Sequence, residues 1–224
     1  MKVSHIYLVK YRPLVSTPEG VQPAKRFGIP PFVDGSCRRE PDFESKFPSI
    51  SALCRGTLFA PKLKEEDEVV YITTKNLYGE TFWHRRIVAH LKVIKRFDSH
   101  TAAAKWYQAQ GLCLPSNCMV AGSKLFPLSQ TSRGASNCAP GCGSAAASLK
   151  KWNEHYQKRA DSIPVFVVCK TVWKELESPA ILTDQAAFKI LGSWERVRSR
   201  LPIKITVPEL QAIDAVARTF KGEP

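Results

Sequence analysis

The chain has 224 residues, of which 44% are apolar and 24% charged, a composition that excludes a disordered or fibrous protein and fits one large domain. Thirty-three lysines and arginines against twenty aspartates and glutamates leave a net charge of +13, which favours polyanionic partners and above all nucleic acid. The apolar runs are far shorter than the roughly 18–20 residues that cross a bilayer, so no membrane partner is expected. The seven cysteines fit reduced thiols, which predicts a cytoplasmic protein.

The first half of the chain predicts three strands separated by a long loop. Residues 5–11 mix aliphatic and aromatic side chains and predict a strand rather than a signal peptide. Residues 13–61 are rich in Pro, Gly and Ser and predict an irregular excursion with at most short elements, although their five phenylalanines indicate that it packs down and forms a binding surface. Residues 69–74 predict a strand that pairs antiparallel with a long strand within 83–97, the latter with one buried face.

The second half predicts mainly helices. Residues 98–110 have a capping residue at one end and Gly111 at the other, which indicates a helix. Residues 144–160 predict a second helix with a basic face, and 163–170 predict a short buried strand. Two further helices are expected at 183–191 and 207–220, the last with Pro208 in its first turn.

These elements do not repeat in the βα alternation of a doubly wound sheet, so we expect an α+β fold built on a small mixed β-barrel with flanking helices. The segments PPFVDGSCRREPDFE, DEVVYITTK, RRIVAHLKVIKRFDSHTAAAKWY and PSNCMV resemble nucleotide-modification-associated domain proteins. More distantly, the order of elements resembles the PUA-like barrels, including the EVE, ASCH and YTH domains. The resemblance covers about residues 5–130. It implies a PUA-like barrel in 1–130 with the loop 13–61 inserted, and a helical extension in 131–224 packed on it as part of one continuous domain.

The resemblance also implies a pocket that handles a nucleotide, often a modified base of DNA or RNA. Within the loop, Arg38 and Arg39 lie among carboxylates, and arginine forks suit phosphates or guanine edges. An ion-pair network that pins the loop explains them equally well. Asp34 falls at a predicted tight turn, where it either faces a pocket or closes an Asx turn; Phe32 and Ser36 flank it.

A second group surrounds one end of the predicted hairpin. Trp83 is the preferred stacking residue for an extruded base, although a Trp at a strand start is often part of the core. The same group supplies cations and one imidazole, namely Lys75, His84, Arg85 and Arg86. Asn117 offers both a donor and an acceptor to a base edge, with turn or capping duty as the alternative. Lys150 and Lys151, on the helix at 144–160, are expected to bind phosphates.

The cysteines supply only a loose metal pattern. Cys113, Cys118, Cys138 and Cys142 have spacings wider than usual zinc hooks, so zinc is a weak candidate and no cofactor is expected. The deaminase motif and the phosphate-loop, hydrolase-elbow and paired-metal patterns are absent from the sequence.

Three functions therefore compete. The first is recognition of a base, modified in the favoured case, in a basic aromatic pocket. The second is an enzyme such as an N-glycosidase of modified DNA bases, with a role in phage defence, in which Asp34 stabilises the sugar cation or orients water and Asn117 holds the base. The third is an RNA-associated adaptor that binds only through the basic helix at 144–160.

Overall fold

The computed structural model describes residues 4–133 and 144–219, which form an α+β fold around one mixed sheet. Its strands are β1 (Ile6–Tyr11), β2 (Ser49–Ser51), β3 (Glu68–Thr73), β4 (Arg85–Phe97), β5 (Phe166–Lys174), β6 (Ala180–Leu182) and β7 (Ile203–Ile205). Its helices are α1 (Pro18–Phe27), α2 (His100–Ala109), α3 (Ala145–Ser162), α4 (Asp184–Leu191), α5 (Trp194–Arg198) and α6 (Val207–Thr219). Within these two ranges, no helix has the length and apolar character that crossing a membrane requires.

The sheet is open. Its strands follow the order β2-β5-β4-β3-β1-β7, and β6 pairs with the first three residues of β4, Arg85–Ile87. The pair β1–β3 is parallel, and the other pairs are antiparallel, including the predicted β3–β4 pair. Because β2 and β7 lie at opposite ends of this order and do not pair, the α+β class is confirmed but the closed PUA-like barrel is not.

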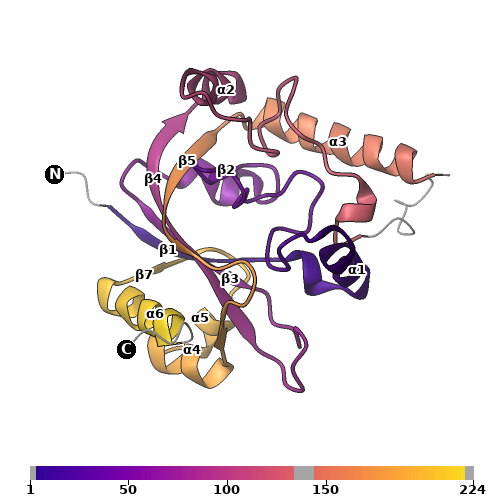
Figure 1. Cartoon of the computed structure of the whole chain (residues 1–224). Helices are drawn as coiled ribbons and strands as arrows, with labels where there is room; N and C mark the ends of the chain where they lie inside the picture. The colour runs from indigo at the N-terminus through magenta and orange to yellow at the C-terminus, as the bar shows by residue number, and fades with distance from the viewer. Residues whose placement is uncertain (1–3, 134–143, 220–224) are drawn as a thin grey trace.

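Both faces of the sheet are covered. On one face, β1 and β3 pack their apolar side chains against the segment that follows α1, through residues such as Phe43 and Phe59. On the other face, α4, α5 and α6 cover β3 and β4 through residues such as Leu191 and Ile213. The first seven residues of β4 are all buried, so the prediction of one exposed face is wrong: the C-terminal helices bury the second face. Figure 1 shows these helices together at the lower left, with α2 and α3 on the opposite side of the sheet.

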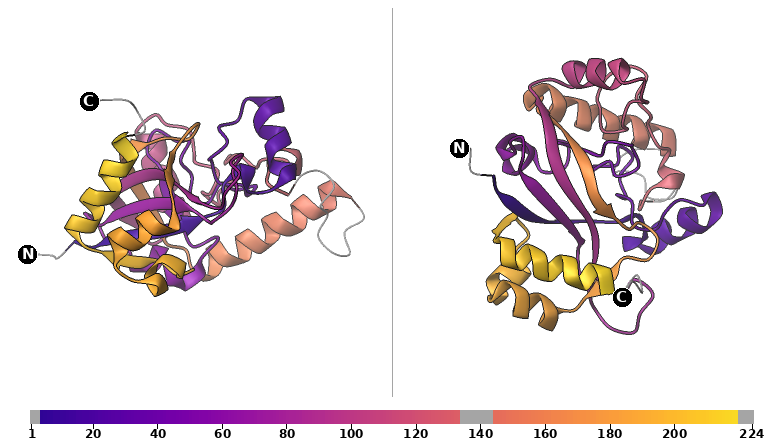
Figure 2. Two further views of the ribbon diagram at one scale, coloured as in Figure 1. Left: turned by 90° about the horizontal axis from the view of Figure 1, so that it is seen from below. Right: turned by 60° about the vertical axis from the view of Figure 1, so that its left-hand side comes forward.

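Two sequence expectations need correction. The loop 13–61 contains a ten-residue helix, α1, whose N-terminus is capped by the Thr17 side chain and whose C-terminus is ended by Gly28 in a left-handed conformation. The region 131–224, expected as a helical extension, also supplies β5, β6 and β7, so one sheet runs across the expected boundary. Figure 2 shows the long α3 extending away from the sheet on the side where α1 lies.

Candidate functional site

A cavity of about 790 Å³ opens beside the carboxyl ends of the parallel strands β1 and β3. Ligands commonly bind at the carboxyl ends of parallel strands, because the loops that leave the sheet there diverge and leave a hollow between them. We call it the Asp34 cavity. Its wall combines carboxylates, rings and cations from segments far apart in the sequence: Lys10, Tyr11, Arg12, Asp34, Ser36, Glu40, Ser51, Cys54, Arg55, Phe59, Tyr71, Lys75, Trp83, Arg133, Tyr156 and Arg200.

Asp34 reaches the cavity because the chain around it pairs with the segment that follows β1. The amide of Leu14 donates to Val33 O at 2.8 Å, and the amide of Gly35 donates to Arg12 O at 3.1 Å. A Cβ at position 35 would lie 2.6 Å from the Oγ of Ser132 and 3.2 Å from the carbonyl oxygen of Pro13, so the absence of a side chain at Gly35 allows both of these residues to pack this closely against it. The close packing fixes Asp34 at the cavity wall.

The two oxygens of Asp34 have different surroundings. Oδ1 accepts from the amide of Ser36 at 2.9 Å, from its hydroxyl at 2.5 Å and from the amide of Glu40 at 3.0 Å. No group in residues 4–133 or 144–219 donates to Oδ2. Burial raises the pKa of Asp34 to about 6, against the opposing effect of the hydrogen bonds from Ser36. The site therefore holds a carboxylate at neutral pH with one oxygen available to a ligand.

Glu40 lines the same cavity but is fully occupied by protein donors. Its Oε1 accepts from the amide of Ser51 at 2.9 Å, and its Oε2 accepts from the hydroxyl of Ser51 and from Asn117 Nδ2 at 2.9 Å. Burial raises the pKa of Glu40 to about 8, against the opposing effect of the hydrogen bonds from Ser51 and Asn117. Asn117 is buried behind Glu40 and also bonds Ser49, so it positions this carboxyl group rather than lining the cavity.

The two arginines of the loop are structural in this geometry. Arg39 is 0% exposed, and its guanidinium donates to the backbone carbonyls of Asp34, Ser36 and Gln130. The same guanidinium lies over the Phe126 ring, 4.3 Å from the ring centroid. Arg38 is likewise buried, and it donates to Asn153 and to two backbone carbonyls. Neither arginine is placed to bind a phosphate. Both instead hold the loop in place, which is the alternative that the sequence left open.

Aromatic side chains form the apolar part of the wall. Tyr11 and Tyr71 meet edge to face with ring centroids 5.9 Å apart, and the Tyr11 hydroxyl donates to Phe32 O at 2.5 Å. Trp83 lies at the mouth and is 59% exposed, so its face remains free to stack. Trp83 therefore lines the cavity and is not part of the core.

Cations surround the mouth. Arg12, Arg133 and Arg200 are exposed, and Arg133 lies over the Trp152 ring at 3.7 Å. Lys10 is held more firmly, because its Nζ donates to Val197 O at 2.5 Å and to Ser199 O at 2.6 Å. Burial lowers the pKa of Lys10 to about 8, with a further contribution from Arg85.

The hairpin that joins β3 and β4 brings one more predicted residue to the cavity and leaves three outside it. Lys75 lines the cavity and pairs with Asp184 at 2.5 Å. His84, Arg85 and Arg86 are buried away from it, the arginines in ion pairs with Asp184 and Glu80 respectively.

Other candidates lie elsewhere. Phe32 is buried and packs on Tyr78, outside the Asp34 cavity. Lys150 and Lys151 are exposed on α3, and neither lines this cavity.

The cysteine pattern gains no support from the described part of the chain. Cys113 is exposed, whereas Cys118 is buried and donates to His100 O. No cluster of metal-ligating side chains occurs in the described ranges, and Cys138 and Cys142 lie outside them.

Several cavity residues carry no motif that would have marked them. Tyr11, Arg55 and Tyr156 come from a strand, a turn and a helix, and they meet only through the fold. The single usable signal is that Tyr11 ends the first predicted strand and Arg12 follows it, because side chains at the carboxyl end of a strand with a parallel neighbour commonly face a ligand. Comparisons with family models, with curated proteins and with solved structures find no match.

Proposed function

We propose that the protein recognises a single nucleobase of DNA or RNA, modified in the favoured case, in the Asp34 cavity. The observation that carries the proposal is the free Oδ2 of the buried Asp34 in a hollow with aromatic walls and exposed cations at its mouth. At about 790 Å³, the cavity falls within the range of small-ligand sites. The resemblance to nucleotide-modification-associated proteins supports the same function, although the open sheet departs from a closed PUA-like barrel.

Each part of the wall has a counterpart in an extruded nucleotide. Asp34 Oδ2 accepts a hydrogen bond from an amino or imino group on the base edge. Stacking on Trp83 contributes about 1–3 kcal/mol, because every base has a π face. Arg12 and Arg200 neutralise phosphate at the mouth, which makes binding dependent on salt. A cytoplasmic location belongs to this proposal, and the free cysteines of the described residues support it.

The test measures binding of short single strands that carry one unmodified, hydroxymethylated or glucosylated base. The decisive variant is Asp34→Asn, because Asn can keep its carbonyl oxygen toward the three protein donors and place an NH₂ group where Oδ2 lies. The matched control is Asp98→Asn, which makes the same substitution at the exposed residue that precedes Ser99, the N-cap of α2. We expect D34N to weaken binding by about tenfold or more, the usual effect of losing a hydrogen bond to a charged group, and D98N to leave it unchanged.

The pH dependence gives a second measurement. Because the pKa of Asp34 is about 6, wild-type binding should weaken as the pH falls through 6, whereas the D34N variant should show no such change. Equal affinity of wild type and D34N for every oligonucleotide would refute the proposal.

A second candidate, hydrolysis of the N-glycosidic bond, is favoured by the same free oxygen with a pKa of about 6. In that reaction Asp34 accepts a proton from water, the water oxygen bonds to C1′ of the sugar as the bond from C1′ to the base nitrogen breaks, and the base leaves with the bonding electrons. The proton held by Asp34 then passes to the base, which restores the carboxylate. The assay incubates the protein with plain, hydroxymethylated and glucosylated DNA and then detects abasic sites. Abasic sites with wild type and none with D34N would support the enzyme, and no abasic sites with any substrate would exclude it.

A further inference from the structure

A second, smaller cavity of about 340 Å³ lies next to the Asp34 cavity. We call it the lysine pocket, because Lys62, Lys64 and Lys204 all line it. Its remaining wall is formed by His5, Tyr7, Leu58, Phe59 and Pro202. The function proposed above does not use it.

The two cavities share their walls. Phe59 lines both, and the segments 55–64 and 200–204 each contribute residues to both. Tyr7 and Tyr11 lie on one face of β1, four residues apart, which places them about 13 Å from each other. The two cavities therefore adjoin at Phe59, and a ligand that extends from the Asp34 cavity past this side chain comes to the lysine pocket.

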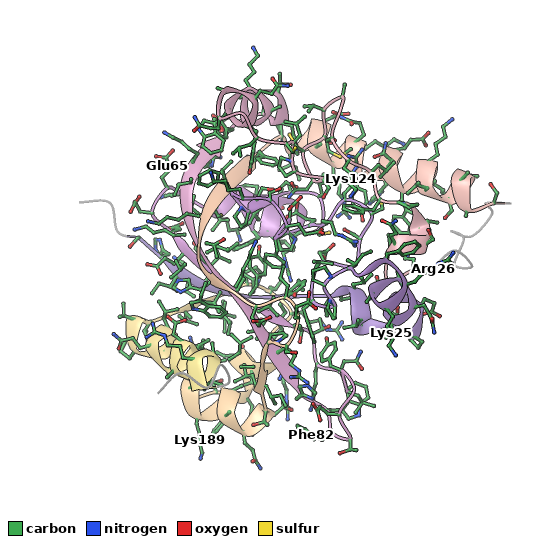
Figure 3. The ribbon with its side chains drawn as sticks, in the orientation of Figure 1. Lys25, Arg26, Glu65, Phe82, Lys124 and Lys189 are labelled. Carbon is green, nitrogen blue, oxygen red and sulfur yellow. The ribbon has the colours of Figure 1, made fainter. Side chains whose placement is uncertain are left out.

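The charges along this route are unneutralised. The three lysines are exposed, and within residues 4–133 and 144–219 their ammonium groups make no ion pair. The acidic residues next to Lys64 in the sequence do not cancel them. Asp67 is buried and accepts from the amides of His5 and Lys64, and Glu66 pairs with Lys92 at 2.6 Å. Glu65 does not line the pocket, and Figure 3 shows it at the outer edge of the molecule.

We propose that the lysine pocket holds the sugar–phosphate backbone of a single-stranded polynucleotide whose base occupies the Asp34 cavity. This proposal rests on the proposed function and adds the place where the strand that carries the recognised base is bound. Three exposed ammonium groups supply the positive charge that phosphates require, and the Leu58 side chain, 47% exposed at the lysine pocket, offers an apolar contact to a sugar or base. A free mononucleotide reaches only the first cavity.

The experiment compares a labelled single strand of about ten nucleotides, with the recognised base at its centre, and the corresponding mononucleotide. The lysine-pocket variant carries Lys62→Gln, Lys64→Gln and Lys204→Gln. The matched control carries Lys95→Gln, Lys105→Gln and Lys189→Gln, which remove the same charge at exposed positions outside both cavities. Figure 3 shows Lys189 pointing outward from α4.

Removing three phosphate contacts should lower the slope of log Kd against log salt by about 2 and weaken strand binding at least about tenfold near 0.1 M salt. Mononucleotide binding should stay unchanged, and the control should change strand binding by less than about threefold. The proposal is overturned if the lysine-pocket variant and the control bind the strand equally. If wild type binds neither ligand, the proposed function itself fails, so the two failures are distinguishable.

Discussion

Replacing Asp34 by Asn should change how the stability of the protein depends on pH. Burial raises the pKa of Asp34 from 3.8 to about 6, so the folded state disfavours the charged form. For an acid with a raised pKa, the contribution to stability is fully present below 3.8 and is lost as the pH rises through 6. Asn is uncharged at every pH, so the stability of the variant does not fall in this way as the pH rises.

The magnitude follows from the pKa shift. A shift of slightly more than two units, at about 1.4 kcal/mol per unit, costs the wild-type fold about 3 kcal/mol at pH 8 and about half of that at pH 5. The stability of D34N relative to wild type should therefore rise by about 1.5 kcal/mol between these two pH values. The loss of charge-assisted bonds from Ser36 and Glu40 sets the offset between the two proteins, and the pKa shift sets its change with pH.

Urea unfolding of wild type and D34N at pH 5 and pH 8, with linear extrapolation to water, measures this difference. Asp98→Asn serves as the control, because it makes the same substitution at an exposed position, where substitutions usually change stability little. A D34N variant that is less stable than wild type by the same amount at both pH values would show that Asp34 is not buried as described.

Three further predictions concern the frame of the site and the packing of the C-terminal helix. Arg39→Ala should lower the free energy of unfolding by about 3–5 kcal/mol, measured by urea unfolding, because it removes a buried guanidinium from its carbonyl and carboxylate partners. Gly35→Ala should cost about 1–3 kcal/mol through the clash with Ser132, and the double variant with Ser132→Gly should recover most of the lost melting temperature. Burial lowers the pKa of His90, but the carboxylates of Asp214 and Glu68 outweigh burial and leave this pKa above 6.5. The contribution of His90 to the free energy of unfolding is therefore fully present below pH 6.5 and is lost as the pH rises through the pKa of the folded state. Asp214→Asn should flatten that dependence in unfolding curves between pH 5.5 and 8.5, and an unchanged curve would contradict the pairing.

The long elements could be predicted from the sequence because their signals are local. A run rich in β-branched residues marks β3, and alternating apolar residues mark β4. Ser99 and Thr183 cap α2 and α4, as the start signals predict. The helix α1 could not be predicted, because the signal against a helix from Pro23 and the flanking Pro and Gly residues is stronger than the start signal from Thr17. The strands β6 and β7 have three residues each, too few for a periodic pattern.

The candidate site could be predicted only in part, for a similar reason. Asp34, Ser36, Lys75 and Trp83 come from segments of unusual composition, and they do line one cavity. Arg39 has the same signature, but a guanidinium that binds backbone carbonyls cannot be told from one that binds phosphate until the loop is folded.

The pairing of Ile6 with Ile205 has a consequence for how the cavity comes into being during synthesis. Because β1 is synthesised long before β7, it has no antiparallel neighbour on its outer edge until β7 has been made, and the Lys10 ammonium group has no carbonyls to bind until Val197 and Ser199 have been made. An exposed strand edge is a template for pairing with other chains, so the nascent protein should be most prone to aggregate before residues 203–205 emerge. Competence to hold a ligand should therefore arise late and all at once.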